Sequence, residues 1–270
     1  MALTTHIINF LFAYRRGEID FFRRNPAQVQ QEQLTRLLKE GAETHFGRDC
    51  GMEGVRSVEQ FQQRVPLFDY ESFAPWIDRA RQGEADVIWP GTIRWFAKSS
   101  GTTGSKSKFI PVSNEGLQDA HMQGPKDTIA FFTSTYPESD VFSGKTLTLG
   151  GSCQIEREND SAQTGDLSAI LIENTPKYLG WRKVPDTKTA LISDFEEKVR
   201  RICEETTSEN VSNFAGVPSW NLVMMIKILE YTGKNNILEV WPNMELFVHG
   251  GMNFKPYREQ YRRIIPSDEM

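Results

Sequence analysis

The sequence predicts an α/β fold in which strands and helices alternate along the chain. Short runs of β-branched and aromatic residues are separated by segments whose apolar residues recur at helical spacing. The 270 residues are 39% hydrophobic, enough to bury a sizeable core as one large domain or two small ones. Predicted strands cover residues 93–97, 109–112, 145–149, 211–215 and 246–249. Predicted helices cover residues 3–23, 26–46, 113–135, 189–205, 218–231 and 254–263, with short helices over 57–83 joined at Pro66 and Pro75.

The first helix, residues 3–23, is expected to be amphipathic and packed on the body of the protein. Its apolar stretch, residues 7–14, precedes its cations Arg15 and Arg16. A signal peptide has the opposite order, and a membrane span needs roughly 18 apolar residues. We therefore predict neither.

Caps and breakers set the limits of the other helices. Asn25 followed by Pro26 is typical of an N-cap and first helical residue. Ser113 is the expected N-cap of the helix to Thr135, which should kink or split at residues 124–125, Gly-Pro. Gly41 should weaken and Gly47 end the second helix, and Gly233 should close the helix that Pro218 begins. Leu191, Phe195, Val199 and Ile202 set the helical spacing of residues 189–205.

Residues 99–108, Ser-Ser-Gly-Thr-Thr-Gly-Ser-Lys-Ser-Lys, lie between two predicted strands. Glycines let backbone N–H groups approach a polyanion, hydroxyls add donors, and lysine adds a mobile positive charge. A connecting loop without a ligand is the structural alternative. The length of the run and the lysines at 106 and 108 are not needed by a tight turn, which favours a nucleotide-triphosphate loop.

Two common phosphate loops do not fit this run. A P-loop has four residues between its first glycine and Gly-Lys-Ser/Thr and opens a helix. Here two residues separate Gly101 from Gly104, Ser105 precedes Lys106, and a strand-like segment follows. The Rossmann fingerprint G-x-G-x-x-G is absent from the sequence as well.

Residues 100–104 followed by Lys108 resemble the phosphate loop of the adenylate-forming ligase superfamily. The doubled serine before the glycine and the continuation Ser-Lys-Ser-Lys-Phe-Ile-Pro resemble one branch, the bacterial Gretchen Hagen acyl-acid amido synthetases (the auxin-responsive promoter family). Residues 216–220, Gly-Val-Pro-Ser-Trp, are similar to the family's segment beside the acyl pocket. Residues 245–252, Glu-Leu-Phe-Val-His-Gly-Gly-Met, are similar to its turn at the adenine. The resemblance covers most of residues 50–270 and implies a layered αβαβα large-domain fold, incomplete at the C-terminus.

The resemblance also implies roles for individual residues. Hydroxyls and backbone N–H groups of residues 99–104 would hold the β- and γ-phosphates of ATP, and Lys108 would be the loop's lysine. Lys106 is an additional cation. The implied nucleotide-binding residues are Ser99, Ser100, Gly101, Thr102, Thr103, Gly104, Ser105, Lys108, Gly250, Gly251 and Met252. The implied substrate-binding residues are Val217, Pro218, Ser219 and Trp220. No catalytic residue and no metal ligand is assigned.

Each of these assignments has a structural alternative. Gly250 and Gly251 also suit a tight turn that leaves a sheet edge. Residues 217–220 also suit a helix start with Pro218 as its first residue and Trp220 in the core. His249 is expected to be structural. Residues 150–152, Gly-Gly-Ser, end a predicted strand and are candidates to border the substrate, ahead of a polar, mobile loop over 152–165.

The implied activity has two steps. A carboxylate attacks the α-phosphorus of ATP, with Mg²⁺ bridging phosphate oxygens, and gives acyl-AMP and pyrophosphate. An amine, an amino acid in the family, then displaces AMP. Coenzyme A as the acceptor, a non-catalytic nucleotide- or acyl-binding module, and a protein–protein scaffold remain alternatives.

The resemblance divides the chain into a helical N-terminal segment, 1–48, and an α/β nucleotide- and acyl-binding region, 49–270. The family also has a serine-glutamate-glycine motif whose glutamate holds magnesium, an aspartate for the ribose, and a mobile C-terminal domain. These are expected to be absent from this chain, which by itself should not complete adenylation.

Composition excludes several classes. The net charge of −5 and pI near 5.5 give no electrostatic case for a nucleic-acid surface. Cys50, Cys153 and Cys203 are widely spaced without a C-x-x-C pair, which favours a reducing cytoplasm and argues against zinc. The four histidines lack metal-ligand spacing. We expect a cytoplasmic enzyme without membrane or nucleic-acid partners.

Overall fold

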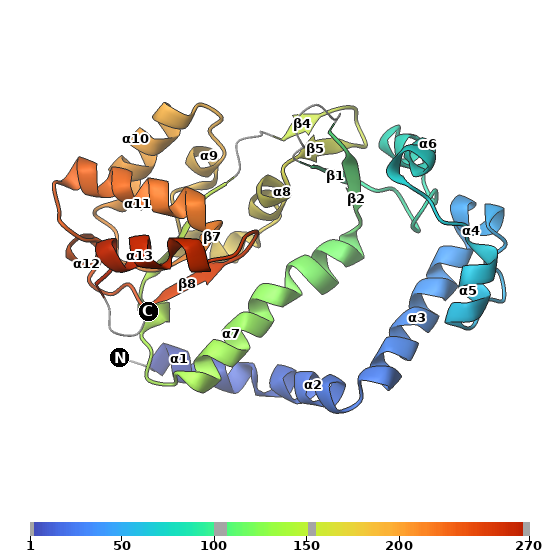
Figure 1. Cartoon of the computed structure of the whole chain (residues 1–270), viewed down its shortest axis with the longest axis horizontal. Helices are drawn as coiled ribbons and strands as arrows, with labels where there is room; N and C mark the ends of the chain where they lie inside the picture. The colour runs from blue at the N-terminus through green and yellow to red at the C-terminus, as the bar shows by residue number, and fades with distance from the viewer. Residues whose placement is uncertain (1–2, 100–106, 151–154, 267–270) are drawn as a thin grey trace. The chain divides into compact units, whose positions relative to one another are not determined.

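The computed structural model describes residues 3–99, 107–150 and 155–266 (Figure 1). These residues form two compact units, which we name by their sheets. The hairpin unit consists of Tyr14–Thr128 and Ile155–Leu171, and the parallel-sheet unit of Met1–Ala13, Ile129–Gln154 and Ile172–Met270. Strands and helices alternate in the described residues, as the sequence predicts.

The hairpin unit has a four-stranded mixed sheet in the order β2-β1-β5-β4. β1 pairs antiparallel with β2 and parallel with β5. Its helices include α6, whose Ile77 and Ala80 pack with Phe96 of β1 in one core cluster. The elements are α2 (Ala13–Arg24), α3 (Pro26–Ala42), α4 (His45–Asp49), α5 (Val58–Arg64), α6 (Tyr70–Arg81), β1 (Trp95–Lys98), β2 (Phe109–Val112), a π-helix (Gly116–His121), β4 (Glu156–Arg157) and β5 (Gln163–Gly165).

The parallel-sheet unit has four parallel strands in the order β6-β3-β7-β8. Its core includes Leu147 of β3, Phe214 of β7 and Met225 of α11, all buried. The elements are α1 (Leu3–Leu11), β3 (Lys145–Thr148), β6 (Lys183–Val184), α9 (Thr187–Ala190), α10 (Phe195–Thr206), β7 (Val211–Gly216), α11 (Pro218–Thr232), α12 (Ile237–Val240), β8 (Leu246–His249) and α13 (Arg258–Ile264), with 3₁₀ turns at Val141–Ser143, Lys177–Arg182 and Lys255–Tyr257. Helices α7 (Gln123–Thr135) and α8 (Leu167–Glu173) run from one unit into the other.

The predicted helix over 3–23 is wrong as a single element. It ends at Leu11, and α2 begins at Ala13, because its two halves belong to different units. In one unit the Thr5 hydroxyl donates to the carbonyl oxygen of Ser139. In the other, Arg15 pairs with Asp127 on α7. Several apolar side chains expected to pack are exposed instead, with Phe10 80% accessible.

The second predicted helix also divides. α3 ends at Ala42, and Thr44 then caps α4, its hydroxyl oxygen accepting a hydrogen bond from Gly47 N at 2.9 Å. Gly47 therefore lies inside a helix and does not end one. Pro75 lies inside α6, whereas Pro66 falls in the predicted joint between α5 and α6.

Local caps decide three other boundaries. The Ser113 hydroxyl oxygen accepts from Gly116 N at 3.0 Å, as predicted for a cap. The break falls at Met122 and not at residues 124–125, because Pro125 lies in the first turn of α7, where its missing N–H is not needed. Residues 189–205 form two helices, since Asp186 and Asp194 each cap one.

The polar segment over 152–165 is not entirely a loop. β4 and β5 pair antiparallel across it, and β5 adds to β1. No helix of the described residues is long and apolar enough to span a bilayer.

Candidate functional site

In the parallel-sheet unit, glycines of the sequence motifs lie at the carboxyl ends of three parallel strands. β3, β7 and β8 lead into Gly150, Gly216 and Gly250 respectively. β7 pairs in parallel with both β3 and β8, so these turns share one edge of the sheet. β7 and β8 are labelled in Figure 1. Ligands of open α/β sheets bind outside the carboxyl ends of the strands.

Strand pairing brings two predicted motifs into contact. Gly216, which ends β7, is paired with His249, which ends β8. Gly250 N donates to Gly216 O at 3.4 Å. A Cβ built on Gly251 would lie 3.2 Å from Cγ2 of Val217. The adenine-turn residues and the acyl-segment residues of the sequence analysis therefore lie against each other.

The turn after β8 exposes bare backbone. Gly250 and Gly251 are both exposed, and nothing lies within 4 Å of a Cβ built on Gly250. Gly251 has φ of +81°, in the region that favours glycine. Met252 is partly exposed beside them. A flat ring fits such a surface, because no side chain stands between it and the peptide groups.

An aromatic cluster packs behind this turn. Phe247 of β8 stacks on Phe214 of β7, with ring centroids 4.1 Å apart. His249 stacks on Phe254 at 4.7 Å, which gives it a packing contact. The buried Tyr261 hydroxyl donates to Pro218 O at 2.8 Å, and burial raises the pKa of Tyr261. Strand, turn and the start of α11 are thus held together.

The start of α11 agrees with the predicted helix start at Pro218 but not with the predicted placement of Trp220. Pro218 is its buried first residue, with Val217 in the N-cap position and Ser219 half-buried. Trp220 is 56% exposed, so its placement in the core is wrong. Its ring lies 6.2 Å from that of Phe195 on α10. The inward position is taken by the fully buried Asn221, whose amide donates to Val217 O at 3.2 Å.

Gly150 has a structural requirement of its own. A Cβ there would lie 2.4 Å from Ala190 O, at the end of α9. Its carbonyl oxygen lies 3.5 Å from Nζ of Lys198, a lysine that is only 7% exposed. Close packing therefore explains the glycine without a ligand. Gly151 and Ser152 lie outside the described residues.

The hairpin unit carries the two ends of the predicted phosphate loop. Ser99 N donates to Lys108 O at 2.8 Å, and Lys108 N donates to the Ser99 hydroxyl oxygen at 3.2 Å. These bonds extend the antiparallel pairing of β1 with β2. The two strands are as predicted, and their direct pairing as a hairpin is shown by the structure. Ser100, Gly101, Thr102, Thr103, Gly104, Ser105 and Lys106 lie outside the described residues.

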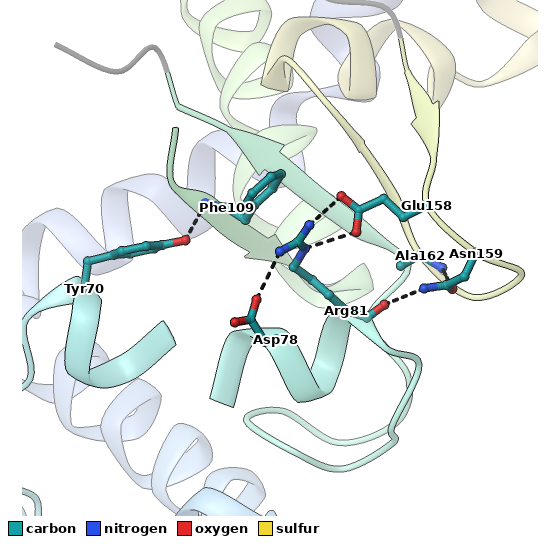
Figure 2. Close-up of polar contacts among 7 residues, drawn as sticks. All are labelled: Tyr70, Asp78, Arg81, Phe109, Glu158, Asn159 and Ala162. Carbon is teal, nitrogen blue, oxygen red and sulfur yellow. Dashed lines mark hydrogen bonds and ion pairs between the residues drawn. The ribbon is translucent and has the colours of Figure 1, made fainter. Parts of the chain in front are cut away.

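Two residues missed by the sequence analysis hold the Lys108 end of the hairpin (Figure 2). The Tyr70 hydroxyl oxygen accepts from Phe109 N at 2.7 Å. The Arg81 guanidinium lies over the Phe109 ring, 3.6 Å from its centroid, and pairs with Glu158. No periodicity or motif links these positions, since 77 residues separate Arg81 from Glu158.

Lys108 lies near the beginning of α6. Its Nζ lies 5.1 Å from the centroid of the Tyr70 ring. The pKa of Asp69, which caps α6, is lowered chiefly by hydrogen bonds from Ser72, with a smaller contribution from the Lys108 charge. The described residues include no group of three or more His, Cys, Asp or Glu able to hold a metal ion.

Comparison with known proteins identifies a family. The GH3 family N-terminal domain matches residues 15–270. A jasmonoyl–L-amino acid synthetase of Oryza sativa subsp. japonica is 34% identical over 131 residues, which cover 48% of this chain and 28% of the rice protein. A jasmonoyl–L-amino acid synthetase of Nicotiana attenuata is 30% identical over 131 residues, covering 48% of this chain and 22% of that protein.

A solved structure shares the fold. The GH3.15 acyl acid amido synthetase superposes with a TM-score of 0.71 at 18% identity, covering 92% of this chain and 54% of that one. The predicted α/β fold is thereby confirmed as the fold of that structure. This chain spans about half the length of that structure and between a fifth and a third of the two plant synthetases.

Proposed function

This chain belongs to the GH3 family, and on that premise we propose that it is the nucleotide- and acyl-binding part of an ATP-dependent acyl-acid amido synthetase. The enzyme would activate a carboxylic acid as acyl-AMP and then join the acyl group to an amine. The plant relatives are named for jasmonoyl–amino acid and indole-3-acetic acid–amido products. An acid with an apolar body and an amino acid acceptor are therefore the substrates we propose.

The observation that carries the proposal is the pairing of Gly216 with His249. It sets the bare turn at Gly250 and Gly251 directly against Val217. A flat base on the exposed peptide groups and an acyl group beside Val217 and Trp220 would then be neighbours. Binding both substrates side by side favours attack of the carboxylate oxygen on the α-phosphorus.

The residues proposed to hold ATP are those that the family resemblance of the sequence implies. The backbone of Gly250, Gly251 and Met252 would support the adenine, and the run 99–105 with Lys108 would hold the β- and γ-phosphates. Val217, Pro218, Ser219 and Trp220 would border the acyl group. Within this assignment residues 49–270 form the binding region, and residues 1–48 a helical segment before it.

The chemistry is a displacement at phosphorus. A carboxylate oxygen attacks the α-phosphorus, the bond from phosphorus to the bridging oxygen breaks, and pyrophosphate leaves with that electron pair. Lys108 and the backbone donors would stabilise the charge that accumulates on the leaving group. Mg²⁺ would supply further neutralisation of the phosphate oxygens. The amine then attacks the acyl carbon, loses a proton, and releases AMP.

The proposed compartment is the cytoplasm, because the cysteines are few and widely spaced. The proposed partners are the acid and the amine, which follow from the family, and the net charge gives no case for nucleic acid.

Exchange of labelled pyrophosphate into ATP tests the proposal, assayed on the complete gene product with a panel of carboxylic acids. Exchange that depends on one class of acid is the expected result. MgATP binding without exchange for any acid would favour a non-catalytic module. Absence of MgATP binding, measured by calorimetry, would exclude the nucleotide-binding role altogether.

A further inference from the structure

β2 is the outer strand of the hairpin unit's sheet, and neither of the two residues whose backbone nitrogens face outward leaves an unpaired N–H donor. Ser99 and Lys108 form a hydrogen-bonded pair, so the alternation of an antiparallel ladder turns the backbone nitrogens of Phe109 and Pro111 outward. Pro111 has no N–H, and an outward-facing position on an edge strand tolerates proline because no ladder hydrogen bond is needed there. The Phe109 N–H is taken by the Tyr70 hydroxyl.

Tyr70 contacts two consecutive residues of the hairpin. Its hydroxyl oxygen accepts from the Phe109 amide at 2.7 Å, and its ring lies 5.1 Å from the Lys108 ammonium. The same side chain therefore fixes the backbone after Lys108 and provides an aromatic face for its charge.

Arg81 holds the Phe109 side chain from the other end of α6 (Figure 2). Its guanidinium donates to both carboxylate oxygens of Glu158, at 2.6 and 3.2 Å, and to Asp78 at 3.0 Å. Asn159 donates to the backbone carbonyl of Arg81 at 2.8 Å. The Arg81 and Glu158 side chains are 21% and 24% exposed. Water therefore screens this bidentate ion pair less than a pair on the open surface.

A neighbouring pair on the same helix lacks the link to β2. Arg79 also donates to a glutamate, Glu84, through two nitrogens and lies 4.9 Å from the Trp76 ring. Its partners Glu84 and Trp76 both lie outside β2. Arg79 is therefore a matched control for the chemistry of Arg81.

We propose that Tyr70 and Arg81 are positioning residues for Lys108, fixing the start of β2 so that the ammonium is presented to the β- and γ-phosphates from one place. A lysine charge on a four-carbon stem is mobile, so its effect on a phosphate depends on how well its Cα is fixed. The inference rests on the proposed function, because it requires that Lys108 binds the phosphates of ATP.

The test compares Tyr70→Phe, Arg81→Met and the control Arg79→Met with the wild type. Calorimetry measures the affinities for MgATP and for AMP, which lacks the β- and γ-phosphates. Amide hydrogen exchange of Phe109 is followed without nucleotide, and thermal melting reports the global fold. Tyr70→Phe keeps the ring under Lys108 and removes only the hydroxyl.

We expect Tyr70→Phe to weaken MgATP binding about fivefold, which corresponds to the loss of one hydrogen bond. Arg81→Met should weaken MgATP binding as well, and both variants should leave the affinity for AMP unchanged. Phe109 exchange should accelerate by a similar factor, while Arg79→Met alters neither. A purely structural role would weaken MgATP and AMP equally, or lower the melting temperature with no change in affinity, and either result overturns the inference.

The two proposals fail in different ways. Wild-type protein that binds no MgATP overturns the proposed function and this inference together. Wild-type protein that binds MgATP, with Tyr70→Phe binding equally well, overturns this inference alone, whatever happens to Phe109 exchange.

Discussion

Gly251 lies so close to Val217 that a single added carbon would crowd it. A Cβ on Gly251 would be 3.2 Å from Cγ2 of Val217, and its φ of +81° is strained for any residue with a side chain. The neighbouring Gly250 is open, with nothing within 4 Å of a Cβ. The two glycines of one turn therefore meet different constraints.

Gly251→Ala and Gly250→Ala should consequently separate stability from binding. We expect Gly251→Ala to lower the free energy of unfolding by about 1–2 kcal/mol, because of the left-handed backbone. Gly250→Ala should change it by less than about 0.5 kcal/mol. Its methyl group would stand on the surface proposed for the adenine, so MgATP affinity should fall. Urea unfolding and calorimetry measure the two effects, and equal behaviour of the variants in both would contradict the assignment.

Lys108→Ala should weaken MgATP more than AMP. Its ammonium is exposed at the end of the hairpin, and we expect about a tenfold loss for a charge-assisted contact. The loss should shrink as salt is raised, since exposed charges are screened. The exposed Lys188 on α9 is the control, and Lys188→Ala should leave both affinities unchanged. An unchanged MgATP affinity in Lys108→Ala would contradict the proposed contact between Lys108 and the phosphates.

Replacing two glycines of the helical part by alanine should change the free energy of unfolding in opposite directions. A Cβ on Gly47 would lie 2.0 Å from Gly41 O, a backbone atom that cannot move without unwinding α3. Gly47→Ala should therefore cost about 3 kcal/mol or more of unfolding free energy. Gly17 lies on an exposed face of α2 with nothing within 4 Å, so Gly17→Ala should add about 0.5–1 kcal/mol. Chemical denaturation measures both, and a neutral Gly47→Ala would contradict the close approach.

The pair of Arg15 and Asp127 should contribute to acid sensitivity. Arg15 donates two hydrogen bonds to the Asp127 carboxylate, at 2.7 and 2.9 Å, and they are the main cause of its lowered pKa. Because the folded pKa lies below the unfolded value, the stabilisation is complete above the unfolded pKa and is lost as the pH falls through the folded one.

Asp127→Asn should therefore lower the free energy of unfolding by about 1 kcal/mol at pH 7, the contribution expected of a partly exposed ion pair. The difference should narrow as the pH falls below about 4, where the wild-type carboxylate also becomes neutral. Melting curves from pH 7 to pH 3 measure it. The more exposed Glu18, which Arg15 contacts at 3.1 Å, is the control, and Glu18→Gln should show a smaller change. A pH-independent difference would argue against linkage through Asp127.

Sequence reasoning succeeded where neighbours along the chain decide the structure. Gly233 ends α11 with φ of +66°, and Ser113 caps its helix, both as predicted. It failed where two local signals competed. Asp194 restarts a helix in the middle of a stretch whose apolar spacing suggested one continuous element. Pro75 is tolerated inside α6, whose Ile77 and Ala80 are buried in a core cluster.

The sequence by itself determined which segments are candidates for the site: a glycine- and hydroxyl-rich connection between two strands, and two glycine motifs at strand ends. Only the tertiary structure decided that Gly251 meets Val217, that Trp220 faces outward, and that Tyr70 and Arg81 hold the residue after Lys108. The physical reason is that caps and turns depend on bonds within a few residues. Strand register and the ion pair across 77 residues depend instead on which buried surfaces pack together.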